Sequence, residues 1–335
     1  MEQEEAGQPP RRLVGIDLGI ASRLWDPGTG QIIRTLRGHQ HSVYAVCAVT
    51  VAGRQLLATG SSGGSVGLWD PATGEIVSTL RGDQHWVYAV CPVTVAGRQL
   101  LATASGDRTA RLWDPATGEV ARMLRGNREG VKAVSPVVMP VAGRRLLAAG
   151  SRDGSVRLWD PATGQIIRAL RGDRHLVNAV CPVPVAGRSL LATGGSESAV
   201  RLWDPETGEI VRTLHGHQGG VNAVCPVPVA DRPLLATASD DRTVRLWDPE
   251  AGEIVRILHG HQDAVNAVCP VPVPARQLLA TASSDRTVRL WDPATSLPLI
   301  TVPLRHQALA VSQTDSLLAI GVDAGVLVIE LNLGS

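Results

Sequence analysis

The sequence predicts an all-β fold in which one four-stranded antiparallel sheet is repeated and the copies close into a ring. The dipeptide Trp-Asp occurs seven times, and its copies are 44 residues apart except for one step of 46. A fixed period of this length indicates a repeat architecture. Each period also contains four short apolar segments separated by turns, which is the pattern of antiparallel strands. The dipeptides begin at Trp25, Trp69, Trp113, Trp159, Trp203, Trp247 and Trp291.

The elements follow in order along the repeat that contains Trp247. Gly-His opens a loop, and the β-branched segment 221–225 predicts the first strand. A Pro-rich turn leads to a second strand at 234–238, and the turn Ser-Asp-Asp-Arg leads to a third at 243–247. The turn Asp-Pro-Glu-Ala-Gly leads to a fourth strand at 253–258. Such a sheet cannot bury its apolar faces alone, so we expect the repeats to stack side by side.

The repeated unit resembles the WD40 family. The features that carry the resemblance are the period near 44, the closing Trp-Asp and a Gly-His such as Gly216-His217, which lies 30 residues before Trp247. The resemblance runs from about Leu13 to the C-terminus. It implies a seven-bladed β-propeller of four-stranded antiparallel blades, closed by strands from the two ends of the chain.

The repeats predict one domain. We expect residues 1–12 to be a disordered N-terminal segment and 13–335 to form a single propeller. Six complete repeats would occupy about 39–304, and a composite closing blade would combine about 27–38 with 305–332.

The count of predicted strands does not decide how the two ends of the chain close the ring. In the composite arrangement, 13–26 is left over and packs on an edge, caps the bottom of the ring, or is the remnant of a longer protein. Alternatively, 13–37 completes the closing blade with one C-terminal strand, and the last two strands are spare. An eight-bladed ring would leave two blades with three strands.

Composition argues against several functional classes. The net charge is +1 over 335 residues, so the chain has no overall field to attract nucleic acid or an anionic membrane. The first twelve residues lack the apolar core of a signal peptide. No segment approaches the roughly 18 apolar residues of a membrane span. We therefore expect a cytoplasmic protein that binds neither nucleic acid nor membrane.

The cysteines occupy one recurring position and show neither metal-ligand nor small-domain disulfide spacing. They are Cys47, Cys91, Cys181, Cys225 and Cys269. We expect small buried side chains in a reducing compartment. The absence of Phe and the strong preference for Arg over Lys indicate a GC-rich genome, which suggests a bacterial source.

The recurring His, Thr, Asp and Trp invite comparison with a catalytic site. The resemblance to WD40 blades implies instead a buried network of loop His, second-strand Thr, turn Asp and third-strand Trp. Two complete sets are His217, Thr237, Asp241, Trp247 and His261, Thr281, Asp285, Trp291. A carboxylate and a hydroxyl satisfy both nitrogens of a buried imidazole. Because a catalytic triad occurs once and this set recurs, we expect no enzyme activity and no cofactor or metal.

Other repeats depart from this pattern. The loop His is replaced by Asp83, Asn127 and Asp173, the turn Asp by Gly63 and Glu197, and one Thr by Ala149. We expect Asp83 and Asp107 either to repel or to share a proton, or Asp83 to face solvent. The arginines of the third strands, such as Arg111 and Arg157, are expected on a solvated, charge-paired face.

The repeats differ most in the loop before the first strand, which lies at the mouth of the central channel in a propeller. Outside the Trp-Asp dipeptides the chain has three aromatic residues, and all three lie there, in two consecutive repeats. Trp and Tyr are enriched at interaction hot spots. We therefore predict a partner-binding patch of Tyr44, Trp86, Tyr88, Lys132, His41, His85 and Arg128.

The expected function is a non-catalytic protein–protein interaction scaffold or docking propeller, whose partners bind at the channel-mouth face. Bacterial relatives of this type are often sensor domains of larger signalling proteins, and the mid-blade start suggests that this chain is a fragment of one. A small-ligand or glycan-binding propeller is the alternative, for which a deep pocket lined by Trp86 and Tyr88 would be needed. A hydrolase is less favoured, because no unique acid–base pair is evident.

Overall fold

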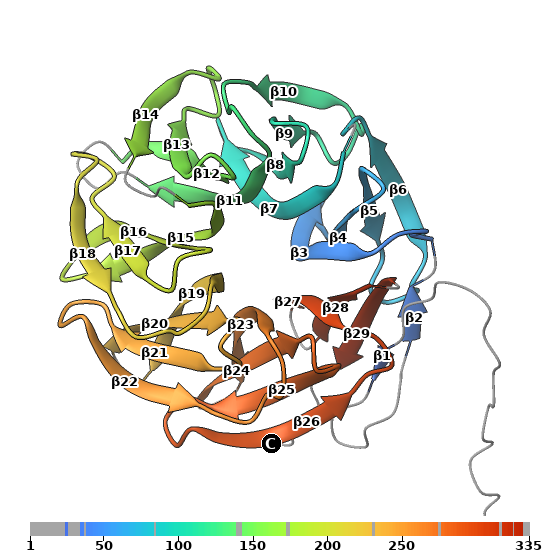
Figure 1. Ribbon diagram of the computed structural model, residues 1–335. Coiled ribbons are helices and arrows are strands. Elements are labelled where there is room, and N and C mark those ends of the chain that lie inside the picture. The colour runs from blue at the N-terminus through green and yellow to red at the C-terminus, as the bar shows by residue number, and fades with distance from the viewer. Residues whose placement is uncertain are drawn as a thin grey trace, which may run out of the picture.

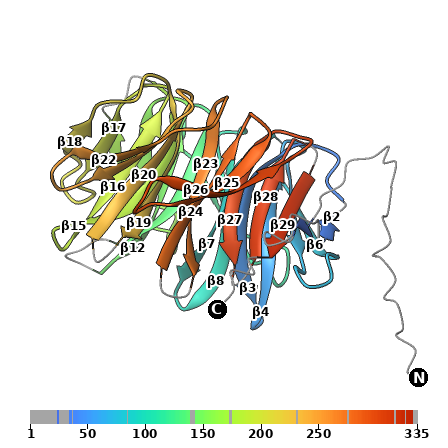
Figure 2. The same ribbon diagram turned by 90° about the horizontal axis from the view of Figure 1, so that it is seen from below.

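The computed structural model shows a ring of β-sheets around a central axis (Figure 1). The structure describes residues 24–25, 34–36, 38–83, 85–138, 143–171, 175–229, 232–273, 276–314, 317–323 and 325–330. The predicted disordered segment 1–12 and most of 13–37 lie outside these residues. Viewed from the side, β3, β27 and β28 run along the axis of the ring (Figure 2).

Six sheets are four-stranded antiparallel blades, each built from consecutive strands. The first blade is β3 (Val43–Val51), β4 (Arg54–Ser61), β5 (Ser65–Trp69) and β6 (Ile76–Arg81). The second is β7 (Val87–Val95), β8 (Arg98–Ser105), β9 (Ala110–Trp113) and β10 (Val120–Leu124). The third is β11 (Val131–Val138), β12 (Arg145–Ser151), β13 (Ser155–Trp159) and β14 (Ile166–Arg171).

The other three blades repeat this order. The fourth is β15 (Val177–Val185), β16 (Arg188–Gly195), β17 (Val200–Trp203) and β18 (Ile210–Leu214). The fifth is β19 (Val221–Val229), β20 (Arg232–Ser239), β21 (Val244–Asp248) and β22 (Glu253–Leu258). The sixth is β23 (Val265–Val273), β24 (Arg276–Ser283), β25 (Thr287–Asp292) and β26 (Leu297–Pro303).

The remaining sheet closes the ring and differs from the blades. It contains β27 (Ala308–Thr314), β28 (Leu317–Val322) and β29 (Gly325–Glu330), with β2 (Arg34–Leu36) antiparallel to β29 and β1 (Leu24–Trp25) parallel to it. The prediction of seven four-stranded antiparallel blades is therefore wrong: the described residues form six, together with one five-stranded mixed sheet. The physical reason is that β29 presents an open edge, which both N-terminal strands use.

The hydrophobic core is divided into clusters that lie between neighbouring sheets. One cluster joins Ala45, Cys47 and Val49 of the first blade to Val87 and Trp113 of the second. Another joins β23–β25 to the closing sheet. Each sheet buries an apolar face against the next sheet. A single sheet is therefore stable only when its neighbouring sheets are present.

The Asp of the Trp-Asp dipeptide stabilises the turn that follows the third strand of its blade. Asp70 accepts a hydrogen bond from the backbone N–H of Ala72 at 2.8 Å and pairs with Arg54 at 2.6 Å. The same ion pair joins Arg98 to Asp114 and Arg232 to Asp248. The Asp therefore closes the turn after the third strand and ties it to the start of the second.

Each inner strand carries a β-bulge near its start. In β3 the pairing with β4 skips Tyr44, because Val43 pairs with Ser61 and Ala45 with Gly60. The same shift occurs in β7, β11, β15, β19 and β23. A bulge changes the direction in which the side chain of the skipped residue points. These six bulge positions hold Tyr44, Tyr88, Lys132, Asn178, Asn222 and Asn266.

Candidate interaction site on the rim face

The segments directly before β3, β7, β11, β15, β19 and β23 are named the rim loops, and the face of the ring that carries them is the rim face. In the fifth blade, His217 of a rim loop joins its Nδ1 to Asp241 at 2.7 Å and its Nε2 to Thr237 at 2.7 Å. The indole N–H of Trp247 donates to the same Thr237 hydroxyl at 2.9 Å. This chain of bonds ties a rim loop to β20, to β21 and to the turn between them.

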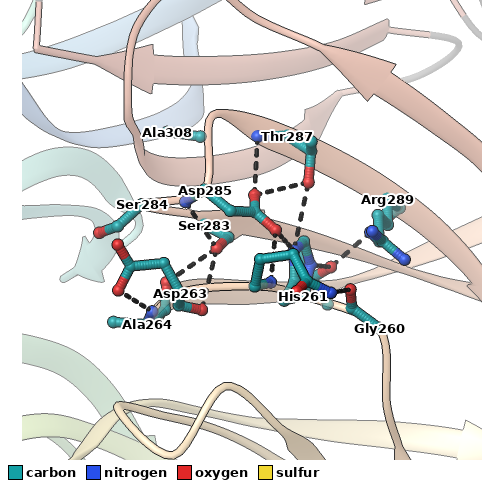
Figure 3. A network of polar contacts seen from close by, with 12 residues as sticks. Gly260, His261, Asp263, Ala264, Ser283, Ser284, Asp285, Thr287, Arg289 and Ala308 are labelled. Atoms are coloured by element: carbon teal, nitrogen blue, oxygen red, sulfur yellow. Dashed lines mark hydrogen bonds and ion pairs between the residues drawn. The ribbon is translucent and has the colours of Figure 1, made fainter.

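The sixth blade contains the same network (Figure 3). His261 joins Asp285 at 2.8 Å and Thr281 at 2.7 Å, and Trp291 donates to Thr281 at 2.9 Å. Burial lowers the pKa of His261, against the opposing effect of Asp285. Burial likewise lowers the pKa of His217, so the neutral form of both imidazoles is favoured, and every ring nitrogen of the two side chains is engaged in a hydrogen bond.

The second blade replaces the His with a buried ion pair. Asp83 is 8 % exposed and contacts the guanidinium of Arg111, which also binds Asp107 at 2.7 Å. Thr103 donates to Asp83 at 3.2 Å. The expectation that Asp83 faces solvent is therefore wrong, and Arg111 separates the two carboxylates that were expected to repel. Burial raises the pKa of Asp83 to about 6; the charge of Asp107 adds to this effect, and Arg111 opposes it.

The third-strand arginines are not on a solvated face, contrary to the sequence-based expectation. Arg111 and Arg157 are only 4 % and 5 % exposed. Arg157 donates to Asn127 at 2.7 Å and pairs with Asp153 at 3.2 Å. The third strand is covered on both faces, so alternation of polar and apolar residues along it does not indicate exposure.

The third blade lacks one acceptor. Ala149 stands where other blades have Thr, and the indole N–H of Trp159 is buried without a hydrogen-bond partner among the described residues. The side-chain nitrogen of Asn127 is also buried without a hydrogen-bond partner among the described residues. Both donors belong to the network that a threonine hydroxyl completes in the fifth blade.

On the rim face, the predicted aromatic residues come together. The rings of Tyr44 and Trp86 are stacked with centroids 5.7 Å apart, and those of Tyr44 and Tyr88 are 5.9 Å apart. Trp86 meets Tyr88 edge-on at 5.9 Å. Trp86 is 42 % exposed, whereas Trp69, Trp113, Trp159, Trp203, Trp247 and Trp291 are almost fully buried.

Two cations border these rings. The ammonium group of Lys132 lies 3.9 Å from the centre of the Tyr88 ring, and the guanidinium carbon of Arg152 lies 5.9 Å from it. Burial and the nearby charge of Arg152 lower the pKa of Lys132 to about 8. Arg152 was missed in the sequence, because it belongs to the β12–β13 turn and gave no signal of its own. We name Tyr44, Trp86, Tyr88 and Lys132 the rim cluster.

The bulges explain the position of the rim cluster. In the later blades the bulge residue is an Asn that holds the next blade: Asn222 donates to the carbonyl of Val265 at 3.2 Å, and Asn266 to that of Ala308 at 2.8 Å. Tyr44, Tyr88 and Lys132 occupy the same position with larger side chains, which contact one another across neighbouring blades. At these three positions the contact of an Asn with the next blade is therefore replaced by contacts among larger side chains.

The other predicted patch residues lie in different places. His85 contacts Trp86, with ring centroids 5.9 Å apart. His41 lines a cavity in the first blade. Arg128 lines a cavity of about 200 Å³ beside Asp153 and Arg171, in the third blade. The structure brings His85 to the rim cluster and gives Arg128 different surroundings.

The described residues offer no group of three His, Cys, Asp or Glu side chains placed to hold a metal ion. Within the described part of the chain, no helix has the length and apolarity needed to cross a membrane. Four of the five cysteines are buried and Cys91 is half-buried, and all five are unpaired thiols. Burial raises the pKa of Cys181 to about 12, so that thiol is unreactive.

A ring of stacked blades whose loops present side chains on one face defines a β-propeller of the binding type. The family model described as "WD domain, G-beta repeat" matches residues 30–70, 74–114, 118–160, 208–248 and 252–292, which together make up more than half of the chain. The chain therefore belongs to the WD40 family, whose propeller fold is typical of protein-interaction scaffolds. A comparison with curated proteins found no match.

Proposed function

We propose that this protein is a non-catalytic scaffold that docks a partner protein on its rim face through the rim cluster. The observation that supports this most strongly is the mutual contact of Tyr44, Trp86 and Tyr88, in which Trp86 is exposed and the two tyrosines are half-buried. They are the chain's only aromatic residues outside the Trp-Asp dipeptides. Residues of this type contribute most of the binding free energy at protein interfaces.

The proposed docking mode depends on a rigid ring. The rim loops that carry the rim cluster are tied to their own blades by the bonds of His39 to Thr59, Asp83 to Arg111 and Asn127 to Arg157. The rim cluster is therefore presented without a large ordering cost on binding. Trp86 gives the partner an apolar surface to cover. Lys132 offers a cation that is already partly buried, so a partner that covers it removes little further water. We expect neither nucleic acid nor membrane as a partner.

The alternative function, binding of a small ligand or glycan at Trp86 and Tyr88, receives less support. Among the described residues, cavities at His41, at Arg128 and at Pro184 are lined by neither of these aromatic residues. An apolar pocket with a few convergent polar groups is the usual small-molecule site. The rim cluster instead presents an exposed Trp86 beside two half-buried tyrosines, which suits a protein partner better.

The cellular setting is part of the same proposal. Buried, unpaired cysteines suit a reducing compartment, so we place the protein in the cytoplasm. The composition, without Phe and with a single Lys, supports a bacterial source. Fractionation of the source cells, followed by immunodetection, tests the cytoplasmic assignment.

Affinity capture tests the proposal. Wild-type protein and the triple variant Tyr44→Ala/Trp86→Ala/Tyr88→Ala are used to capture proteins from the lysate of the source organism. The control is Val77→Ala/Val211→Ala/Leu297→Ala, which removes exposed apolar side chains from outer strands. Circular dichroism checks that all three proteins are folded. Loss of a partner from the rim variant alone supports the proposal, and equal retention by all three contradicts it.

A further inference from the structure

The first blade contains a cavity where the other blades have side chains. Gly63 stands at the turn position of Asp241 and Asp285, and Gly67 stands at the third-strand position of Arg111. A cavity of about 370 Å³ lies between these glycines and the rim loop of His39. Its volume is sufficient for a small organic molecule or for an amino-acid side chain.

The sixth blade shows what normally occupies this place. Asp285 accepts four hydrogen bonds, from His261 at 2.8 Å, the backbone N–H of Gln262 at 3.0 Å, and the N–H and hydroxyl of Thr287 at 2.9 and 2.6 Å (Figure 3). Asp241 of the fifth blade has the equivalent four donors. The position is therefore built to hold a carboxylate.

The first blade keeps these donors and lacks the acid. His39, Gln40 and Ser65 are the equivalents of His261, Gln262 and Thr287, and all three line the cavity. His39 is 8 % exposed. Its Nδ1 has no hydrogen-bond partner among the described residues, whereas Nδ1 of His261 binds Asp285.

The proton on His39 can be assigned from its neighbours. Trp69 donates its indole N–H to the Thr59 hydroxyl at 2.7 Å. The one hydroxyl proton of Thr59 then has two acceptors within reach, Nε2 of His39 at 2.6 Å and the Gly67 carbonyl at 3.3 Å, and we assign it to the shorter contact. Burial, with a contribution from His41, lowers the pKa of His39 to about 4, so the ring is neutral near pH 7. A neutral ring that accepts at Nε2 carries its proton on Nδ1, where it is a donor.

We propose that this cavity binds a carboxylate group from outside the chain, in the place that Asp285 fills in the sixth blade. The bound oxygens would accept from Nδ1 of His39, the N–H of Gln40 and the hydroxyl of Ser65. Arg81 and Asp83 also line the cavity: Arg81 adds a positive charge, and the carboxylate of Asp83 is already paired with Arg111. The inference does not rest on the rim cluster or on the proposed scaffold function.

One chemistry and two sources fit the cavity: a free carboxylic acid, or the Asp or Glu side chain of a protein partner. Sodium acetate, sodium succinate and the blocked tripeptide acetyl-Gly-Glu-Gly-amide are the probes. Each is titrated to millimolar concentrations into ¹⁵N-histidine-labelled protein, at constant ionic strength with sodium chloride. The readout is the imidazole nitrogen resonances, assigned by His→Gln variants.

We expect Nδ1 of His39 to shift with saturation, while His217 and His261 stay unchanged because their own Asp partners occupy them. Response to acetate or succinate identifies a free acid as sufficient, and response to the tripeptide alone identifies a partner's side chain. Absence of a saturable His39 shift with all three probes overturns the proposal. Equal shifts at His217 and His261 overturn it as well, because they show a general salt effect.

A variant that supplies the acid internally provides the second test. A Cβ added at Gly63 would lie 2.6 Å from Cδ2 of His41, whose ring is exposed and can move. Gly63→Asp is therefore made in a His41→Ala background, with His41→Ala alone as the matched control. The new Asp should weaken binding of the same probe by at least about tenfold, since it takes the same hydrogen bonds. Unchanged affinity in the double variant contradicts the proposed position.

Discussion

The ammonium group of Lys132 lies 3.9 Å from the centre of the Tyr88 ring, at equivalent bulges of two neighbouring blades. Such a contact stabilises the charged form of the lysine by about 0.5–1 kcal/mol. Burial and Arg152 act in the opposite direction and lower the pKa of Lys132 to about 8. The rim cluster is therefore a coupled unit and not a set of independent exposed residues.

The titration of Lys132 is the first prediction. Because Lys132 is the chain's only lysine, reductive ¹³C-methylation labels it and the N-terminal amine alone. The wild-type resonance should titrate near pH 8. Tyr88→Leu should lower the pKa of Lys132 by about half a unit, because the ring no longer stabilises the cation. Tyr88→Phe is the control that keeps the ring, and an ordinary lysine pKa in the wild type would contradict the burial of this group.

The second prediction concerns the network of the fifth blade. Trp247 is 1 % exposed and donates to Thr237. Trp247→Ala should lower the free energy of unfolding by about 3–5 kcal/mol, since it opens a cavity and leaves a polar group unpaired. Urea titration measures the change, with the exposed Val211→Ala as control. A loss no greater than that of Val211→Ala would refute the structural role of Trp247.

The third prediction is a stabilising change. Ala149→Thr should place a hydroxyl within reach of the Trp159 N–H and the Asn127 amide, both of which lack partners among the described residues. We expect a gain of about 1 kcal/mol in the free energy of unfolding. Ala149→Val has the same shape without the hydroxyl and should give no gain. If both variants change stability equally, the effect is due to packing and the hydrogen-bond account is wrong.

The fourth prediction is a pH dependence from Asp83. Its pKa of about 6 in the folded state exceeds the value of roughly 3.9 in an unfolded chain. The folded state therefore binds more protons between these values, so Asp83 contributes stability below about pH 4 that is lost as the pH rises through 6. Asp83→Asn removes this dependence and keeps an acceptor for Arg111, as Asn127 does for Arg157.

The measurement for Asp83 is urea unfolding of wild type and Asp83→Asn at several pH values from 4 to 7. The stability of the variant relative to wild type should rise over this range, by on the order of 2 kcal/mol. Titrating groups remote from Asp83 are shared by the two proteins and cancel in the difference, which therefore reports Asp83 together with Asp107, its neighbour across Arg111. A difference that is independent of pH would show that Asp83 is fully ionised throughout, with Arg111 as its dominant partner.

The sequence was sufficient to indicate the repeat, the blades and the place of the aromatic residues, because each of these depends on spacing alone. The sequence did not predict the contacts between different blades. The positions of Tyr44 and Tyr88 were visible as rim positions, but their mutual contact depends on the bulges, which no residue type marks. Arg152 was missed for the same reason, since it reaches Tyr88 from the next blade.

The buried arginines show a second limit. Arg111 alternates with apolar neighbours, and alternation normally separates a solvent face from a core face. In a ring of stacked sheets both faces of β9 are covered, so the polar face is internal and needs Asp83 and Asp107 as partners. Likewise, β1 and β2 both pair with β29, an arrangement that the counting of strands did not predict.

Site-specific photocrosslinking at Trp86 tests the central claim most directly. Trp86 is replaced by the photoreactive p-benzoylphenylalanine, and Val211, which is 51 % exposed on an outer strand, is replaced in a matched protein. After irradiation in cells of the source organism, the account predicts a discrete protein adduct from position 86 and none of that mass from position 211. An adduct from position 211 only, or the same adduct from both, would contradict docking at the rim cluster.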